Sequence, residues 1–240
     1  MLVDVHTMGV RTDTERIDNL IVDKCKLVCH MTHINLCNWV EKFGTTPEIM
    51  FMEWACIGGT VLGHNNPYLS SKNILFTGTL TGRDYDIFSY IVDNSDFNVC
   101  VFGLFLKEKI SDEIKQKFLK CPKINLMPSK KYGNFWEFYE HADLALNFSY
   151  PNQTQLNSKI YDYALYGIPI VSERDNPSKQ LLLRNKGREV IFNNPQEFLK
   201  AFNDLYLENI DRMEIRNFML KYHLWDKRAL SLYNKILELL

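Results

Sequence analysis

The sequence predicts an α/β protein: a doubly wound parallel sheet preceded by a partial second α/β unit. Three observations predict this fold. Apolar runs alternate with amphipathic runs from about residue 72 onward, a Gly-, Asn- and Pro-rich stretch lies at 58–71, and a shorter alternation precedes that stretch. Apolar strands that alternate with helices form a parallel sheet covered on both faces. The first unit has too few elements to cover both faces of a sheet by itself.

The first unit, residues 1–57, contains two apolar runs and two runs with helical spacing. Gly44 ends the second helical run, as glycine often does at a helix C-terminus. The expected order is a strand at 2–5, a helix around 17–21, a strand at 26–30, and a helix from Thr32 or His33 to Gly44. Residues 58–71 are expected to form a linker.

The second unit, residues 72–222, repeats the alternation more fully, and a C-terminal helix is expected within 223–240. Six strands are expected at Asn73–Thr77, Asn98–Phe102, Lys123–Met127, Leu144–Asn147, Ile168–Val171 and Glu189–Phe192. Helices are expected at Tyr85–Val92, Asp112–Leu119, Phe135–His141, Ser158–Tyr166, Ser178–Arg184, Pro195–Tyr206, Asp211–Lys221 and Trp225–Leu240.

Composition excludes several classes of partner and site. The formal net charge of −1 does not favour nucleic acid. The chain has no Cys-x-x-Cys pair and no Asp-x-Asp at the end of a strand, so no metal site is expected. It has neither a signal peptide nor an apolar run of about 20 residues. We therefore expect a cytoplasmic protein, peripheral to a membrane at most.

Two strand ends carry groups suited to a phosphate. Gly78 follows the first strand of the second unit, where a glycine lets backbone approach a ligand closely. Lys159 lies in the first turn of the helix that Asn157 or Ser158 is expected to cap. A helix dipole disfavours a cation at that end, so Lys159 is either a solvated surface lysine or a ligand of a bound diphosphate.

The segment Lys159-Ile-Tyr-Asp-Tyr-Ala-Leu-Tyr-Gly-Ile-Pro-Ile-Val-Ser resembles the donor-site helix and following strand of GT-B glycosyltransferases. Three further segments resemble the same family in the same order: Phe76-Thr-Gly-Thr-Leu, Tyr139-Glu-His-Ala-Asp-Leu-Ala-Leu-Asn, and His223-Leu-Trp-Asp-Lys-Arg-Ala. The resemblance covers about residues 70 to 240. It implies that the second unit is the Rossmann-like, nucleotide-sugar-binding C-terminal domain, and that residues 1–57 are a remnant of the acceptor-side domain.

The resemblance also implies a reaction, transfer of a sugar from a nucleoside diphosphate sugar to an acceptor hydroxyl, with no metal and no cofactor beyond the donor. The implied acceptor is a glycan, lipid or protein. The implied site residues are Gly78, Thr79, Arg83, Asn157, Ser158 and Lys159 at the diphosphate, Asp162 at the ribose, Met127 and Pro128 at the base, and His6 as the catalytic residue facing the sugar.

The sequence departs from the family pattern at one carboxylate. Many retaining members carry two glutamates eight positions apart, which fall here on Thr154 and Asp162. Thr154 supplies no carboxylate, so the anomeric outcome stays open. Because the resemblance implies that residues 1–57 are only a remnant of the acceptor-side domain, the alternative is a non-catalytic or partner-dependent nucleotide-sugar-binding subunit, with a separate N-terminal half or a second copy as its partner. A sugar-nucleotide epimerase is disfavoured because no dinucleotide fingerprint is present.

Overall fold

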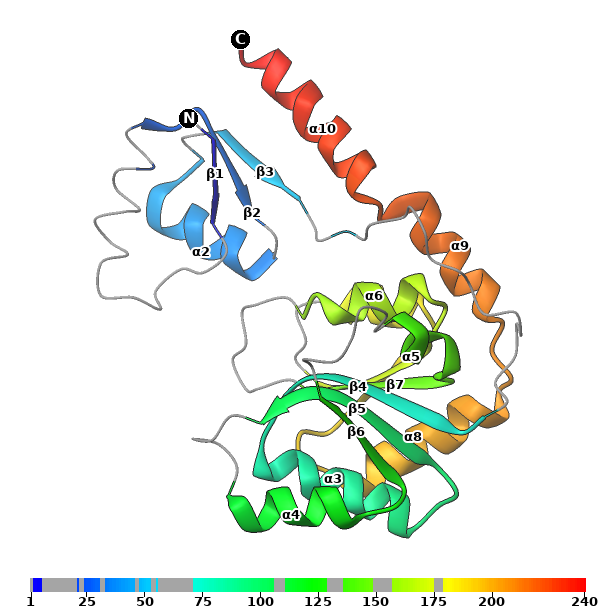
Figure 1. The fold of residues 1–240 in the computed structure, drawn as a ribbon. Helices are drawn as coiled ribbons and strands as arrows, with labels where there is room; N and C mark the ends of the chain where they lie inside the picture. Colours follow the sequence, from blue (N-terminus) through cyan, green and yellow to red (C-terminus); the bar gives the residue numbers. More distant parts are fainter. Residues whose placement is uncertain are drawn as a thin grey trace.

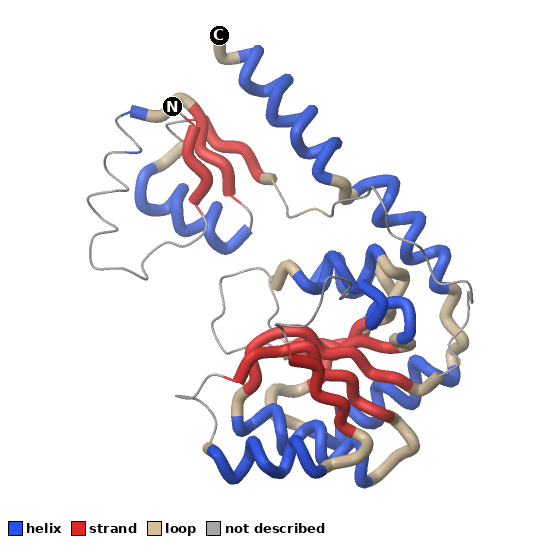
Figure 2. The backbone as a smooth tube through the Cα atoms, in the orientation of Figure 1, coloured by secondary structure: helices blue, strands red, loops and turns tan. Residues whose placement is uncertain are grey.

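The computed structural model describes residues 2–5, 21, 24–30, 33–45, 48–52, 55, 71–105, 111–128, 136–148, 157–174 and 179–240. Two parallel sheets are present in this part of the chain (Figures 1 and 2). Residues 58–70 of the predicted linker, Ile17 and Leu20 of the first predicted helix, and His6 lie outside the described residues.

The larger sheet has six parallel strands in the spatial order β6-β5-β4-β7-β8-β9. The strands are β4 (Asn73–Leu80), β5 (Asn98–Phe105), β6 (Ile124–Pro128), β7 (Leu144–Asn147), β8 (Ile170–Glu173) and β9 (Arg188–Val190). From β4 the chain winds outward through β5 to β6, and then crosses to the other side of β4 to form β7. The doubly wound prediction is therefore confirmed, and the switch point lies between β4 and β7.

Helices alternate with these strands and cover both faces of the sheet. Figure 1 shows α3, α4 and α8 on one face and α5 and α6 on the other. The helices are α3 (Gly82–Asp93), α4 (Asp112–Lys120), α5 (Trp136–His141), α6 (Lys159–Leu165), α7 (Lys179–Arg184), α8 (Pro195–Leu207) and α9 (Arg212–Tyr222). Each predicted helix of this unit is present, with ends that differ by a few residues.

Helix α8 illustrates how the local sequence defines these elements. Asn194 accepts a hydrogen bond from the Glu197 amide at 3.1 Å, and Pro195 occupies the first helical position. Both features favour a helix start at this point. The apolar residues that follow at helical spacing, such as Phe198 and Phe202, are fully buried, so the amphipathic pattern places α8 against the sheet.

Strands β4 and β5 each extend three residues beyond their predicted ends, so Gly78 and Thr79 lie within β4 instead of following it. Strands β8 and β9 differ as well. β8 begins at Ile170, two residues later than predicted, because the Ile168 amide donates to Tyr163 O and closes the end of α6. Gly167, at φ +70°, makes this turn. β9 ends at Val190, because the Ile191 amide donates to the Glu197 carboxylate rather than to a strand.

The smaller sheet has the order β1-β2-β3, with β1 (Leu2–Val5), β2 (Leu27–His30) and β3 (Glu48–Phe51) all parallel. Strands β1 and β2 and helix α2 (His33–Phe43) were predicted, and Gly44 ends α2 at φ +73°. Strand β3 was not predicted, because its four residues show no alternation of apolar and polar side chains. Its register against β2 defines it instead.

The final helix, α10 (Trp225–Glu238), returns to this smaller sheet. One face of the sheet packs on α2 through Val28 and Trp39. On the other face Leu27, Cys29 and Met52 form a cluster with apolar side chains of the C-terminal helix segment, namely Leu232, Ile236 and Leu239. The first unit was expected to need a further element to cover its sheet, and α10 covers it. Among the described residues, no helix has both the length and the apolar composition needed to cross a bilayer.

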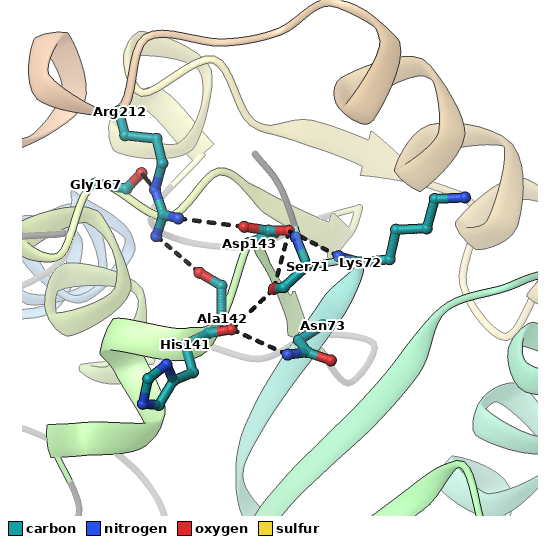
Figure 3. Close-up of polar contacts among 8 residues, drawn as sticks. All are labelled: Ser71, Lys72, Asn73, His141, Ala142, Asp143, Gly167 and Arg212. Carbon is teal, nitrogen blue, oxygen red and sulfur yellow. Dashed lines mark hydrogen bonds and ion pairs between the residues drawn. The ribbon is translucent and has the colours of Figure 1, made fainter. Parts of the chain in front are cut away.

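A buried ion pair holds the larger unit together at the amino end of its sheet (Figure 3). The Arg212 guanidinium, at the start of α9, lies 3.4 Å from Asp143 Oδ1, at the start of β7. The two side chains are 2% and 3% exposed. Burial lowers the pKa of Arg212 to about 10, although Asp143 opposes the shift. The guanidinium also donates to Ala142 O at 2.7 Å and to Gly167 O at 3.2 Å.

The other oxygen of Asp143 anchors the segment that leads into β4. Asp143 Oδ2 accepts hydrogen bonds from the Ser71 amide, from Ser71 Oγ at 3.1 Å and from the Lys72 amide at 2.7 Å (Figure 3). Together, Asp143 and Arg212 therefore connect the entry to β4, the starts of β7 and α9, and the turn that follows α6.

Candidate functional site

The carboxyl ends of β4, β7 and β8 meet at the switch point of the larger sheet. In doubly wound sheets the ligand crevice lies outside such strand ends. Gly78 lies near the end of β4, Asn147 ends β7, and Glu173 ends β8. Helix α6, which connects β7 to β8, begins at this edge with Lys159.

Lys159 points its ammonium group at the end of β4. Its Nζ donates to Thr77 O at 3.1 Å and lies 4.4 Å from the centre of the Phe76 ring. Burial lowers the pKa of this lysine to about 8, although Asp84 and Glu173 act in the opposite direction. Lys159 is therefore not an extended, solvated surface lysine, because its ammonium packs against β4 in a partly buried position.

Gly78 lies beside that ammonium. A Cβ on Gly78 would lie 3.4 Å from Lys159 Nζ, and φ at Gly78 is +142°, a conformation that other residues rarely adopt. The preceding residue is held by Tyr163, whose hydroxyl lies 2.8 Å from the Thr77 amide and 2.9 Å from Thr77 Oγ1. Gly78 lies within β4 and pairs with Gly103 of β5, so the prediction that it follows the strand is wrong, but β4 and α6 are in contact at this point.

Substituting Gly78 by alanine should lower the free energy of unfolding by about 1–3 kcal/mol, because a backbone with φ of +142° is strained for a residue that carries a Cβ. Gly82→Ala is the control, since Gly82 starts α3 without a positive φ and a Cβ there would meet only Ile114 Cδ1. Urea unfolding should show the loss for the first variant alone. Equal effects of the two substitutions would contradict the backbone argument.

A second cation lies in the same region, within a network of buried charges. The Arg83 guanidinium, on α3, lies 3.4 Å from Glu173 Oε2 and 3.6 Å from Asp84 Oδ1. Its Cζ is 5.1 Å from the ring centre of Phe148 and 4.6 Å from that of Phe192. Arg83 was predicted from the sequence as the cation nearest the glycine turn, and the structure places it beside two carboxylates.

The two carboxylates were not predicted as site residues. Asp84 is buried and accepts from the Thr81 amide at 2.7 Å, at the start of α3. Burial raises its pKa, while the Thr81 hydrogen bond and Arg83 act against that shift. Glu173 is 0% exposed. A signal for Glu173 was available in the sequence, since Ile-Val-Ser-Glu ends an apolar strand with a carboxylate at the sheet edge where ligands bind.

The other predicted donor-site residues differ in their exposure and in their contacts. Ser158 precedes α6 with helical backbone angles and makes no side-chain cap hydrogen bond, so the predicted capping by Ser158 is wrong. Asn157 donates from Nδ2 to Phe148 O at 3.2 Å, which ties the start of α6 to the end of β7. Thr79 is exposed near the end of β4, and Asp162 lies within α6, where burial raises its pKa to about 6.

Met127 and Pro128 end β6, at the same edge of the sheet as Gly78. The catalytic prediction, His6, lies outside the described residues. Within the described part of the chain, no three His, Cys, Asp or Glu side chains are grouped so that they could hold a metal ion. The site as described therefore offers two partly buried cations, two buried carboxylates and a glycine with positive φ near the switch point.

Comparison with known proteins identifies relatives of this arrangement. A family model described as glycosyl transferase-like matches residues 91–234. No curated protein sequence matches the chain.

Solved structures match over almost the whole chain at low sequence identity. They include Anabaena HepE in complex with UDP (TM-score 0.75, 11% identity, 99% of this chain and 72% of that one). TarM of S. aureus matches with TM-score 0.70 and 11% identity over 97% of this chain and 49% of that one. The pneumococcal O-GlcNAc transferase GtfA in complex with UDP and GlcNAc matches with TM-score 0.68 and 12% identity, over 99% and 52%. The chain thus spans about half the length of TarM and GtfA.

Proposed function

Because the chain belongs to the glycosyl transferase-like family and has the GT-B fold, we propose that it binds a nucleoside diphosphate sugar and transfers the sugar to an acceptor hydroxyl. The acceptor class is a glycan, lipid or protein. Sugar transfer in general follows from the family, while the donor, the acceptor and the activity of this chain are our proposal.

The observation that carries the proposal is the Lys159 ammonium, held against β4 beside Gly78. Departure of a nucleoside diphosphate leaves negative charge on the diphosphate, and a fixed cation in a partly dry site stabilises such charge well. Lys159 and the backbone at Gly78 lie together at the switch point, where doubly wound sheets bind ligands. This combination supports a diphosphate between β4 and α6.

The remaining roles are assigned around that diphosphate. We propose that Thr79, Arg83, Asn157 and Ser158 assist Lys159, and that Asp162 holds the ribose. Met127 and Pro128 would line the base, because they end β6 at the same sheet edge. His6 would act as the catalytic residue facing the transferred sugar.

Two measurements test the proposal: thermal unfolding with a panel of nucleotide sugars, and an assay of sugar transfer. Thermal unfolding with UDP-, GDP-, ADP- and dTDP-sugars should single out one nucleotide, since a ligand at about 100 times its Kd stabilises the native state by about 2.7 kcal/mol. UDP is the first nucleotide to test, because HepE and GtfA were solved with it. Transfer or hydrolysis of the selected sugar nucleotide is then measured. Absence of stabilisation by every nucleotide sugar in the panel would refute the donor site.

Donor binding should not require a divalent metal, because Lys159 and Arg83 can neutralise diphosphate charge where a metal would otherwise do so. Calorimetric titration of UDP should give the same Kd with EDTA as with manganese, to within about twofold. Binding that EDTA abolishes and manganese restores would contradict this expectation.

UDP binding should weaken as the pH rises through about 8, the pKa of Lys159. Burial has lowered this pKa from the usual 10.5, so the charge is lost between pH 8 and 10.5, where an exposed lysine would keep it. The association constant should fall by at most about tenfold per pH unit. Lys159→Arg retains its charge and should bind with little pH dependence over the same range. A wild-type profile that stays flat from pH 7 to 9.5 would count against Lys159 as the ligand.

A further inference from the structure

Glu173 is a fully buried carboxylate with two separate contacts at the site. Its Oε2 pairs with the Arg83 guanidinium at 3.4 Å, and its Oε1 accepts from the Asn193 amide at 2.9 Å. These contacts join the end of β8 to the start of α3 and to the turn that follows β9. A buried carboxylate is costly unless it is paired and hydrogen-bonded, and both conditions are met here.

The same carboxylate acts on Lys159 through its charge. The charged and titratable groups of this site come from three elements. Asp84 and Arg83 belong to α3, Glu173 belongs to β8, and Tyr163 and Asp162 belong to α6, as Lys159 does. Tyr163 reaches the same residue of β4 as the ammonium does. Asp84 and Glu173 are the two groups that favour the charged form of Lys159 against burial.

Asp84 also stabilises the first turn of α3, because its Oδ2 accepts a hydrogen bond from the Thr81 amide. Glu173, by contrast, lies at the end of a strand. Its position at the end of β8 instead puts a negative charge 3.4 Å from Arg83, and the same charge acts to raise the pKa of Lys159. A nearby opposite charge favours the charged form of a lysine, whereas burial alone would discharge it.

We infer that Glu173 is a positioning residue of the donor site, which holds Arg83 under the strand ends and keeps Lys159 in its ammonium form at Thr77. This inference rests on the proposed function for the identity of the site, but the charge relation between Glu173 and Lys159 does not depend on any ligand. It adds a residue of β8 to the donor site. The residues predicted from the sequence lie on β4, α3, β6 and α6.

The test follows the protonation of Lys159 directly. In the ligand-free protein labelled with carbon-13 lysine, the Lys159 Cε resonance, identified by its loss in Lys159→Arg, is titrated by NMR. In Glu173→Gln the midpoint should move down from about 8 by roughly half a pH unit. Glu208→Gln is the control, since Glu208 pairs with Arg188 on the surface and should leave the midpoint unchanged.

Arg83→Gln provides the opposite arm and a second variant if Glu173→Gln does not fold. Removal of the cation leaves Glu173 unneutralised, so the Lys159 midpoint should move up. If Glu173 and Arg83 only supported the fold, either substitution would loosen the site and admit water. The Lys159 midpoint would then move up in both variants. An unchanged or raised midpoint in Glu173→Gln would overturn the inference, as would a lowered midpoint in Arg83→Gln.

A second measurement links this charge relation to the donor site. The pH at which UDP affinity begins to fall should be lower in Glu173→Gln than in the wild type, by the same interval as the NMR midpoint. If the wild-type chain does not bind UDP, the proposed donor fails while the NMR titration still decides the role of Glu173. If UDP binds but the two profiles coincide, the inference about Glu173 fails and the donor site stands.

Discussion

Replacing Arg212 by methionine should lower the free energy of unfolding by about 3–5 kcal/mol, the usual cost of removing one partner from a buried ion pair. Arg212 and Asp143 are 2% and 3% exposed. The substitution would leave the Asp143 carboxylate buried without its cation. It would also remove the hydrogen bonds that the guanidinium donates to Ala142 O and Gly167 O.

The position of this pair makes the effect global rather than local. Asp143 holds the amides of Ser71 and Lys72 at the entry to β4, and Arg212 holds the turn at Gly167 between α6 and β8 (Figure 3). A Cβ on Gly167 would lie 2.4 Å from Arg212 O, so α9 and this turn are in close contact. Loss of the pair should therefore lower the urea midpoint of the whole larger unit.

Arg188→Met is the matched control. Arg188 pairs with Glu208, but the two side chains are 37% and 46% exposed. Exposed pairs typically contribute less than about 1 kcal/mol. Urea unfolding followed by circular dichroism should separate the two variants clearly. A loss below about 1 kcal/mol for Arg212→Met would show that the pair is not a main support of the fold.

Much of this fold follows from periodicity that can be read along the chain. The alternation of strands and helices from β4 to α9 was predicted with small errors at the ends, because each element carries its own apolar pattern and its own start and stop residues. The first turn of α6 at Lys159 was located in the same way, whereas Gly78, predicted to follow a strand, lies inside β4. Parallel topology then requires both to lie at one edge of the sheet.

The features that were missed depend on contacts between distant segments. Strand β3 is specified by its register with β2, not by its own four residues. The cover on the smaller sheet comes from Ile236 and its neighbours near the C-terminus, about two hundred residues further along the chain than β2. The local sequence places Glu173 at the end of a strand, but its relation to Arg83 appears only when β8 and α3 meet in three dimensions.

The largest functional effect is expected from Lys159→Ala, which should weaken UDP binding by about 1.5–3 kcal/mol, or roughly 10- to 150-fold in Kd. A hydrogen bond to a charged group contributes on this scale. The ammonium lies 3.1 Å from Thr77 O beside Gly78, so a bound diphosphate would meet it without a large rearrangement of the backbone. The measurement is calorimetric titration of UDP near pH 7, below the Lys159 pKa of about 8, where the wild-type lysine is charged.

The control for this experiment is Lys117→Ala. Lys117 is exposed on α4 and pairs with Glu113 at 2.8 Å, so its loss changes the net charge of the chain by the same amount without touching the switch point. If UDP were attracted only by overall charge, both variants would weaken binding similarly, and raising the salt concentration would remove the difference from wild type. A specific ligand should instead lose affinity in Lys159→Ala alone and retain much of the loss at high salt, because the ammonium is partly buried. Unchanged UDP affinity in Lys159→Ala, with the variant folded by circular dichroism, would remove Lys159 from the donor site.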